Sequence, residues 1–254
     1  MRLAALLRFL LSLLALAACV GRPPAPADVA FPSPHLEAIL KFPPGYDGTR
    51  TYPLLVALHG YGGDGFTLSQ VLEKVSRAGL LVAVPQGEYA VPGGGWSWFD
   101  PSRDRDTWAR HDAHTVETVV QLVEPLRAHL RVGRVFVLGF SQGAALAYLV
   151  GLSHPDLVAG VAAVAGDLPP IDTAGAMLHA ADVDAARGVR MFVARGTGDP
   201  SVSRRTYLDQ AAFLRSRGFA VITFEFHGGH DLPDELLGRL AAWLVAAARE
   251  APAR

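Results

Sequence analysis

The chain has 254 residues, of which half are hydrophobic and 19% are charged, and its formal net charge at pH 7 is −1. This composition excludes a disordered chain and provides enough apolar residues for one large α/β domain or two small ones. A nearly neutral chain is also unlike the basic domains that attract nucleic acid, so we expect no nucleic-acid partner.

Residues 1–18 are typical of a secretory signal peptide, because Arg2 and Arg8 precede a short apolar stretch that ends in small residues. The sequence Leu-Ala-Ala-Cys at 16–19 resembles a bacterial lipobox, in which the cysteine becomes the lipidated first residue of the mature protein. Cys19 is the only cysteine in the chain. We therefore expect export to the bacterial cell envelope and a membrane anchor through lipid on Cys19. Ordinary signal cleavage, giving a secreted or periplasmic protein, is the alternative.

Residues 19–34 are rich in Pro and Ala and lack periodicity, which predicts a tether ahead of a folded domain at 35–250. Within that domain, strand-like and helix-like segments alternate. Strands are predicted at 36–42, 53–58, 80–84, 134–139, 158–165, 189–194 and 219–226, and helices at 66–78, 111–130, 142–153, 203–217 and 233–249. The alternation predicts a three-layer α/β fold, with a mostly parallel central sheet, helices on both faces and no large cap domain.

The segment GFSQG, residues 139–143, has the G-x-S-x-G pattern between a predicted strand and a predicted helix. In that setting the glycines allow a tight turn that presents the serine hydroxyl at the carboxyl end of the sheet. Ser141 is therefore the candidate nucleophile. A serine that only caps the helix is the alternative, and the flanking strand and helix make it the weaker one.

A serine nucleophile needs a base and an acid that orients the base, and in this architecture the acid precedes the histidine in the chain. Asp199 is the candidate acid, in a Gly-bounded loop after a predicted strand. His230 is the candidate base because a Gly-Gly turn lets the chain fold back there, and His227 is the alternative. Other downstream acids fit a solvated surface: Asp167, Asp172, Asp182 and Asp184. The remaining histidines lack metal-site spacing, so we expect no metal.

The segment LHGYGGDG, residues 58–65, contains G-x-G-x-x-G after a predicted strand, which is also the pattern of a dinucleotide-binding turn. A dinucleotide site needs an acid at the end of the next strand, and none occurs before Glu88. A serine nucleophile instead needs two amides aimed at the developing oxyanion. We expect these amides from Tyr61, in this loop, and from Gln142, directly after the serine.

The motifs LHGYGGDG, WSWFD, GFSQGAALA, RGTGDPSV and GGHDLP follow one another over residues 53–245. In this order the chain resembles the α/β-hydrolase superfamily, and more narrowly its phospholipase/carboxylesterase branch, which includes acyl-protein thioesterases. The resemblance implies Ser141, Asp199 and His230 as a triad, an oxyanion hole, and activity on carboxylic esters or thioesters without a cofactor. Ala144 is a departure, since this branch often has another glycine there.

The segment 88–108 is long for a loop in a compact domain, which predicts a functional role. Trp96, Trp98 and Phe99 are candidate lining residues of the substrate pocket. The alternative, weighed equally, is that these aromatics cover the end of the sheet as ordinary core.

We expect, in all, an exported serine carboxylesterase that cleaves small esters or thioesters through an acyl-enzyme. Three alternatives use the same triad: a polyester depolymerase, a feruloyl-type esterase and a peptidase. An alternative from another class is a non-catalytic surface lipoprotein that has kept the fold.

Overall fold

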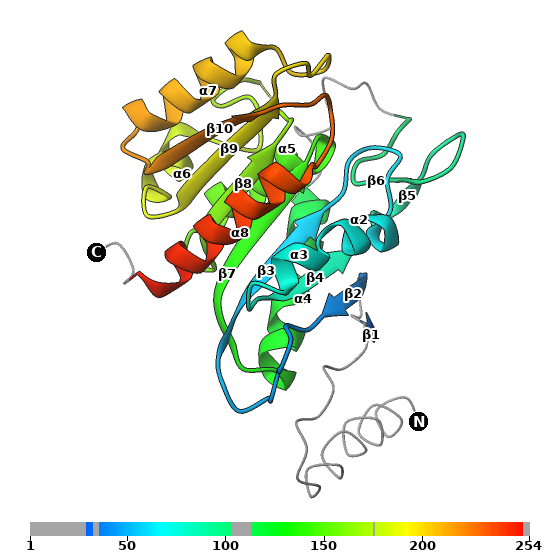
Figure 1. Ribbon diagram of the computed structural model, residues 1–254. Coiled ribbons are helices and arrows are strands. Elements are labelled where there is room, and N and C mark those ends of the chain that lie inside the picture. Colours follow the sequence, from blue (N-terminus) through cyan, green and yellow to red (C-terminus); the bar gives the residue numbers. More distant parts are fainter. Residues whose placement is uncertain (1–28, 33–35, 103–112, 175, 251–254) are drawn as a thin grey trace, which may run out of the picture.

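The computed structural model describes residues 29–32, 36–102, 113–174 and 176–250, and its centre is an eight-stranded sheet (Figure 1). The strand order is β1-β2-β4-β3-β7-β8-β9-β10. The strands are β1 (Val29–Pro32), β2 (Glu37–Lys41), β3 (Tyr52–Leu58), β4 (Leu81–Pro85), β7 (Val132–Phe140), β8 (Val158–Val164), β9 (Arg190–Gly196) and β10 (Val221–Phe226). A separate hairpin consists of β5 (Tyr89–Ala90) and β6 (Trp96–Ser97).

The sheet is parallel from β4 to β10, and only β1 and β2 run antiparallel to their neighbours. The predicted α/β fold with a mostly parallel sheet is thereby confirmed. Because β3, β7, β9 and β10 point the same way, the loops that follow them leave the same edge of the sheet. Ligands of open α/β sheets bind at that edge.

Helices cover both faces of the sheet (Figure 1). The helices are α2 (Gly65–Val71), α3 (Glu73–Ser76), α4 (Ala113–His129), α5 (Gln142–Ser153), α6 (Ala180–Ala185), α7 (Arg204–Ser216) and α8 (Asp234–Arg249). Alternate residues of β3 explain the layers: Leu54 and Val56 pack with α4 to α7, whereas Leu55 and Ala57 pack with α2, α3 and α8. All four are fully buried, as expected of a parallel strand covered on both faces.

The structure corrects two of the predicted segments. Residues 29–32, inside the expected tether, form β1 and pair with β2 at the edge of the sheet. Pro32 is compatible with this position because an edge strand leaves one row of amides unpaired. The helix expected at 66–78 is two helices, α2 and α3, which meet at Leu72, where φ is −84° and ψ is 7°. The expected signal peptide and Cys19 lie outside the described residues.

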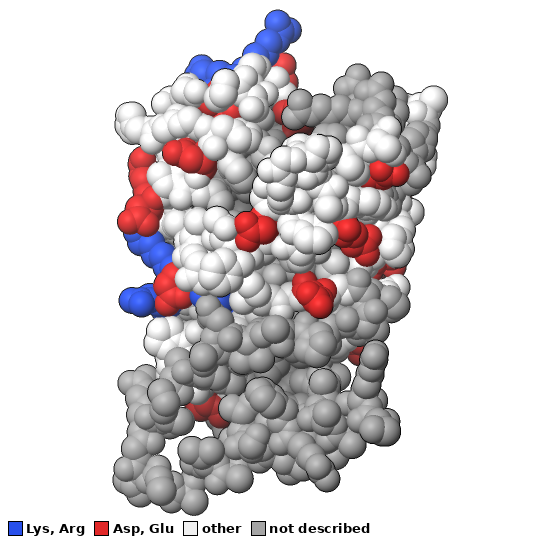
Figure 2. Space-filling view, turned by 90° about the vertical axis from the view of Figure 1, so that its right-hand side faces the viewer, with Lys and Arg blue, Asp and Glu red and all other residues white. Residues whose placement is uncertain are grey.

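Charged side chains are scattered over the face of the molecule shown in Figure 2. Single acidic residues lie among uncharged ones, and Lys and Arg lie toward the upper and left margins of the view. The charges of the described residues therefore form no continuous cluster on this face. Among the described helices, none is long and apolar enough to cross a membrane.

Candidate active site

Ser141 lies at the turn between β7 and α5, with φ at 55° and ψ at −117°. A positive φ is unfavourable for a residue with a Cβ atom, and it persists only where the surrounding structure holds it. The Ser141 amide donates to the Val164 carbonyl at 2.9 Å, which ties the turn to the end of β8. This strained conformation is the one expected of a nucleophile elbow.

The glycines on either side of Ser141 are required by close backbone contacts. A Cβ atom on Gly139 would lie 2.0 Å from the carbonyl oxygen of Gly143, and one on Gly143 would lie 2.4 Å from the carbonyl oxygen of Leu58. Gly166, after β8, is similarly close, since its Cβ would lie 2.4 Å from the Ser141 carbonyl oxygen. Real side chains do not tolerate such distances, so the G-x-S-x-G pattern follows from the packing of this turn.

His230 contacts Asp199 across two loops that follow β9 and β10. The His230 Nδ1 atom lies 3.0 Å from Oδ2 and 3.1 Å from Oδ1 of Asp199. The Asp199 side chain is fully buried, and its Oδ1 also accepts hydrogen bonds from the amides of Ser201 (2.8 Å) and Val202 (3.0 Å). These two amides fix the position of the Asp199 carboxylate, and its contact with Nδ1 fixes the orientation of the His230 ring.

The other candidate histidine lies away from this pair. The His227 side chain is 94% exposed, and its Nδ1 is 3.9 Å from the Glu235 carboxylate. The His230 ring, in contrast, packs on Phe140, with ring centroids 4.9 Å apart. Since Phe140 directly precedes Ser141 in the chain, His230 lies beside the serine turn as well as against Asp199.

The loop after β3 lies next to Ser141. A Cβ atom on Gly60 would be 3.2 Å from the Ser141 Cβ, so the backbone of this loop approaches the serine closely. The Gly63 amide donates to the Gly60 carbonyl within the loop, and the Gly62 amide donates to the Trp96 carbonyl on the β5–β6 hairpin, so both amides already have acceptors. Gly62 has a φ of 73°, which a tight turn allows for glycine. Tyr61 stands at the exposed tip, with 44% of its surface accessible.

Gln142 is the first residue of α5, where amides have no acceptor within the helix. Its side chain turns back and is held by the WSWFD segment. The Gln142 Oε1 accepts from the Trp98 amide at 3.0 Å, and its Nε2 donates to the Ser97 Oγ at 3.0 Å. The same segment reaches the loop after β3, because the Trp96 amide donates to the Gly63 carbonyl. One short segment therefore connects the Gly60–Gly63 loop with the start of α5.

His59, which precedes Gly60, is almost completely buried. Its Nε2 accepts a hydrogen bond from the Gly87 amide at 3.0 Å, which leaves the proton on Nδ1 to be donated to the Gly60 carbonyl at 2.8 Å. Burial lowers the pKa of His59, while the Gly60 carbonyl and Asp64 act in the opposite direction. The Trp98 Nε1 donates to the His59 carbonyl at 2.7 Å. A neutral His59 thus holds the loop that approaches Ser141.

The three aromatic residues expected in the substrate pocket do not share one environment. Trp98 and Phe99 are each only 1% exposed and belong to the main hydrophobic core, which corresponds to the alternative interpretation. Their rings fill the space under the loops instead of lining an open pocket. Trp96 is exposed and lies on the β5–β6 hairpin. A pocket role stays a prediction for Trp96 alone.

Sequence reasoning missed three groups around the site: His59, Ser97 and Arg195. Each is polar and buried in the structure. A signal was present, because each lies inside a motif that carried the family resemblance. Within the described ranges, no three His, Cys, Asp or Glu residues form a group that could hold a metal ion. A hollow of about 410 Å³ lies at the opposite end of β3, lined by residues that include Arg50, Tyr52, Gly79 and Val245.

Known proteins match this chain in both sequence and fold. Residues 47–244 match the family described as Phospholipase/Carboxylesterase. The crystal structure of the Bacillus cereus carboxylesterase superposes with a TM-score of 0.66 at 18% identity, over 84% of this chain and 95% of that one. Acyl-protein thioesterase 2 of Zea mays superposes with a TM-score of 0.64 at 20% identity, over 83% and 98% of the two chains.

One curated relative, named "Putative esterase NocK", comes from Nocardia uniformis subsp. tsuyamanensis. It is 33% identical over 123 residues, which are 46% of this chain and 33% of that protein. The chain thus matches about a third of the length of this relative. The family match is far longer, because it begins ahead of β3, ends within α8, and includes the serine turn and both loops of the His230–Asp199 pair. The chain therefore belongs to the phospholipase/carboxylesterase family of α/β-hydrolases.

Proposed function

We propose that the chain hydrolyses carboxylic esters with Ser141 as nucleophile, His230 as general base and Asp199 as the acid that orients it. The observation that carries the proposal is the contact of His230 Nδ1 with the buried Asp199 carboxylate, beside a serine held at positive φ. With Nδ1–H committed to Asp199, the Nε2 atom of His230 is the one left to act as a base.

In the proposed reaction, Ser141 Oγ attacks the ester carbonyl while His230 Nε2 takes the hydroxyl proton. The amides of Tyr61 and Gln142 stabilise the oxyanion, and His230 then returns the proton to the leaving alcohol as the C–O bond breaks. Water attacks the acyl-enzyme by the same route, which releases the carboxylic acid and restores Ser141. Asp199 stays ionised throughout and stabilises the imidazolium.

The substrate is proposed to be a small ester or a thioester, because the family and the solved relatives include both carboxylesterases and a thioesterase. Both substrates present a carbonyl to the same nucleophile and oxyanion hole. The alternatives are a polyester depolymerase or a feruloyl-type esterase, a peptidase, and a non-catalytic surface lipoprotein. The strained geometry of Ser141 favours a catalytic protein over the last of these, since such strain is costly without a use.

A fluorophosphonate label and ester hydrolysis test the proposal together. The label should modify Ser141 in the wild-type protein and in Ser153→Ala, a control at the exposed end of α5, and should fail with Ser141→Ala. Hydrolysis of p-nitrophenyl esters of graded acyl length, of feruloyl and polyester substrates, and of acyl thioesters then identifies the substrate. A folded Ser141→Ala protein with normal turnover overturns the assignment.

The histidine assignment is tested by His230→Ala and His227→Ala. His230→Ala should reduce kcat nearly as much as Ser141→Ala, because the triad acts as a unit. His227→Ala should leave kcat within about a factor of two, since the exposed side chain touches neither Asp199 nor the serine turn. Asp199→Asn should lower kcat by roughly 10⁴-fold, because the imidazole would be held in the wrong tautomer. A large loss in His227→Ala would contradict the assignment.

We further propose that the protein is exported and anchored to a membrane of the cell envelope by lipid on Cys19. Support comes from the signal-like segment 1–18 and the Leu-Ala-Ala-Cys sequence. The full-length protein should partition into detergent, and Cys19→Ser should remain in the aqueous phase. An unmodified mature N-terminus away from Cys19, found by intact mass, would favour ordinary signal cleavage instead.

A further inference from the structure

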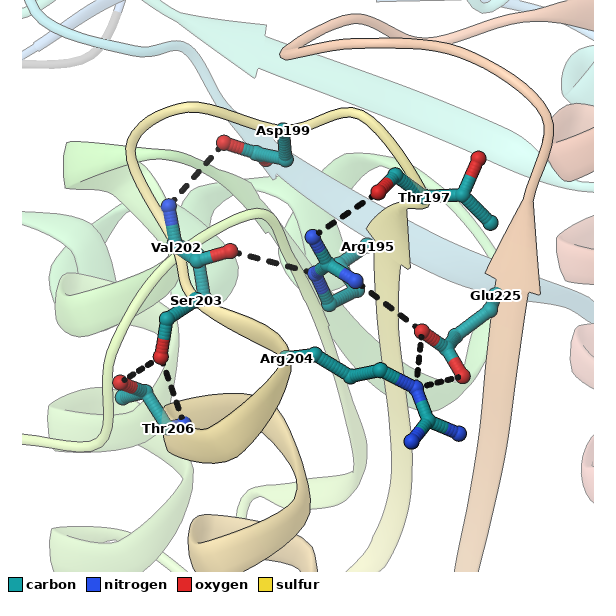
Figure 3. A network of polar contacts seen from close by, with 8 residues as sticks. All are labelled: Arg195, Thr197, Asp199, Val202, Ser203, Arg204, Thr206 and Glu225. Atoms are coloured by element: carbon teal, nitrogen blue, oxygen red, sulfur yellow. Dashed lines mark hydrogen bonds and ion pairs between the residues drawn. The ribbon is translucent and has the colours of Figure 1, made fainter.

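The loop that carries Asp199 is held by Arg195, a buried arginine at the end of β9 (Figure 3). Only 5% of the Arg195 side chain is exposed, and its guanidinium makes three hydrogen bonds. Nε donates to the Val202 carbonyl at 3.1 Å, Nη2 to the Thr197 carbonyl at 3.4 Å, and Nη1 to the Glu225 carboxylate at 3.0 Å. One planar group therefore joins three separate points of the fold.

Two of these points lie on opposite sides of Asp199 in the chain. Thr197 is on the limb that enters the loop, and Val202 is on the limb that leaves it. Val202 also donates its amide to Asp199 Oδ1 at 3.0 Å, so it contacts the carboxylate through its amide and Arg195 through its carbonyl. The loop then ends at the Ser203 cap of α7, where the hydroxyl accepts from the Thr206 amide at 3.0 Å. Figure 3 shows the Asp199–Val202 and Val202–Arg195 contacts in succession, with the Ser203–Thr206 pair beside them.

The third point fixes the guanidinium to the sheet. Arg195 and Glu225 are direct partners in the parallel ladder between β9 and β10, so both side chains leave the same face of the sheet. Glu225 also accepts from Arg204, whose side chain is 66% exposed and which bonds Glu225 rather than the Asp199 loop. Arg204 therefore offers a matched control: it shares the same carboxylate and leaves the loop contacts of Arg195 in place.

A buried cation is costly, and apolar residues of similar volume often stabilise a fold as well or better. The cost of burying the Arg195 guanidinium indicates that its role is geometric. The five donors of a guanidinium lie in one plane at fixed angles, so that several acceptors are held in a fixed arrangement. A lysine could reach the Glu225 carboxylate but could not hold the two loop carbonyls at the same time.

We propose that Arg195 is a positioning residue. By tying both limbs of the loop to β10, it holds the Asp199 carboxylate within hydrogen-bond distance of His230 Nδ1. The inference rests on the proposed function, in which Asp199 orients His230. Arg195 acts only through the loop backbone and does not touch the reacting atoms.

The test measures kcat and KM for a p-nitrophenyl ester in Arg195→Met, Arg195→Lys and Arg204→Met. Displacing a catalytic group by about 1 Å can lower the rate roughly 100-fold. Arg195→Met should therefore lose about 10- to 100-fold in kcat with KM changed less than about threefold, because the ester itself is bound elsewhere. Arg195→Lys should not rescue the loss, and Arg204→Met should keep wild-type kcat. If Arg195→Met does not fold, the kcat of Arg195→Lys decides the test.

A double-mutant cycle with Asp199→Asn distinguishes positioning from general destabilisation. If Arg195 acts through Asp199, then Arg195→Met should lower kcat little further in the Asp199→Asn background, although its effect on the urea midpoint should persist. Equal losses of kcat in both backgrounds, full activity of Arg195→Met, or rescue by lysine would overturn the proposal. An active Asp199→Asn protein would instead overturn the proposed function itself.

Discussion

Ser97→Ala removes one buried hydroxyl that holds the side chain of Gln142, whose amide is a proposed oxyanion donor. The Ser97 Oγ donates to the Phe99 carbonyl at 2.6 Å and accepts from the Gln142 Nε2 at 3.0 Å and from the Phe99 amide at 3.2 Å. Alanine leaves these groups unsatisfied in a site with no exposed surface. Each such group costs about 1–3 kcal/mol, so we expect a loss of about 2–5 kcal/mol in the free energy of unfolding, allowing for partial relaxation.

The same substitution should lower kcat, because Gln142 supplies a proposed oxyanion donor at the start of α5. Deleting one such donor costs about 10²–10³ in kcat, and here the donor is retained but less well fixed. We therefore expect a loss of about tenfold in kcat with KM nearly unchanged. Urea unfolding gives the stability, and p-nitrophenyl ester kinetics at a temperature where every variant is folded give kcat.

Ser76→Ala is the matched control for Ser97→Ala. The Ser76 side chain is also buried and donates to a carbonyl, that of Phe42 at 3.1 Å, but it lies on α3 and away from the loops of the site. It should lose stability while keeping wild-type kcat. Full kcat in Ser97→Ala, or a loss of kcat in Ser76→Ala as large as that in Ser97→Ala, would contradict a role of Ser97 in fixing Gln142.

Two further predictions concern the backbone and the titration of the site. Gly139→Ala should abolish folding or activity, because the new methyl group would meet the Gly143 carbonyl. Gly238→Ala in α8, where a Cβ atom would have nothing within 4 Å, should instead raise the free energy of unfolding by about 0.5–1 kcal/mol, as measured by urea unfolding. Because burial lowers the pKa of His59, its contribution to stability is present above the ordinary histidine value of 6.5 and should be lost as pH falls below it. His59→Gln should therefore show a flatter decline in urea midpoint between pH 7 and pH 5, and an unchanged slope would contradict this explanation.

Local sequence pattern determined the order of the elements and the positions of the main candidate residues. The apolar runs of β3, β4, β7 and β9 predict strands buried on both faces, because hydrophobicity and its period are properties of neighbouring residues. The serine turn is equally local, since its two glycines and the flanking strand and helix all lie within a few residues of Ser141. The catalytic roles of Ser141, Asp199 and His230 remain predictions for kinetics to test.

Only the tertiary structure decided which distant groups meet. The choice between His227 and His230 depends on how the loop after β10 folds against the loop after β9. The two residues in contact there, His230 and Asp199, are 31 residues apart in the chain. The hydrogen bonds that join Gln142 with Ser97 and with Trp98 span 45 and 44 residues. Such contacts depend on the strand order of the sheet, because β4 and β7 lie on either side of β3 although they are far apart in the chain.

The tertiary structure also decided which aromatic residues are buried. Trp98 and Trp96 are two residues apart in one motif, yet one lies in the core and the other on the surface. The β5–β6 hairpin pairs with the loop after β3 through Trp96 and Gly63, and this pairing places the Trp98 indole against the His59 carbonyl. Composition and periodicity predict that a residue can be buried. Whether it is buried depends on which elements the completed sheet brings over it.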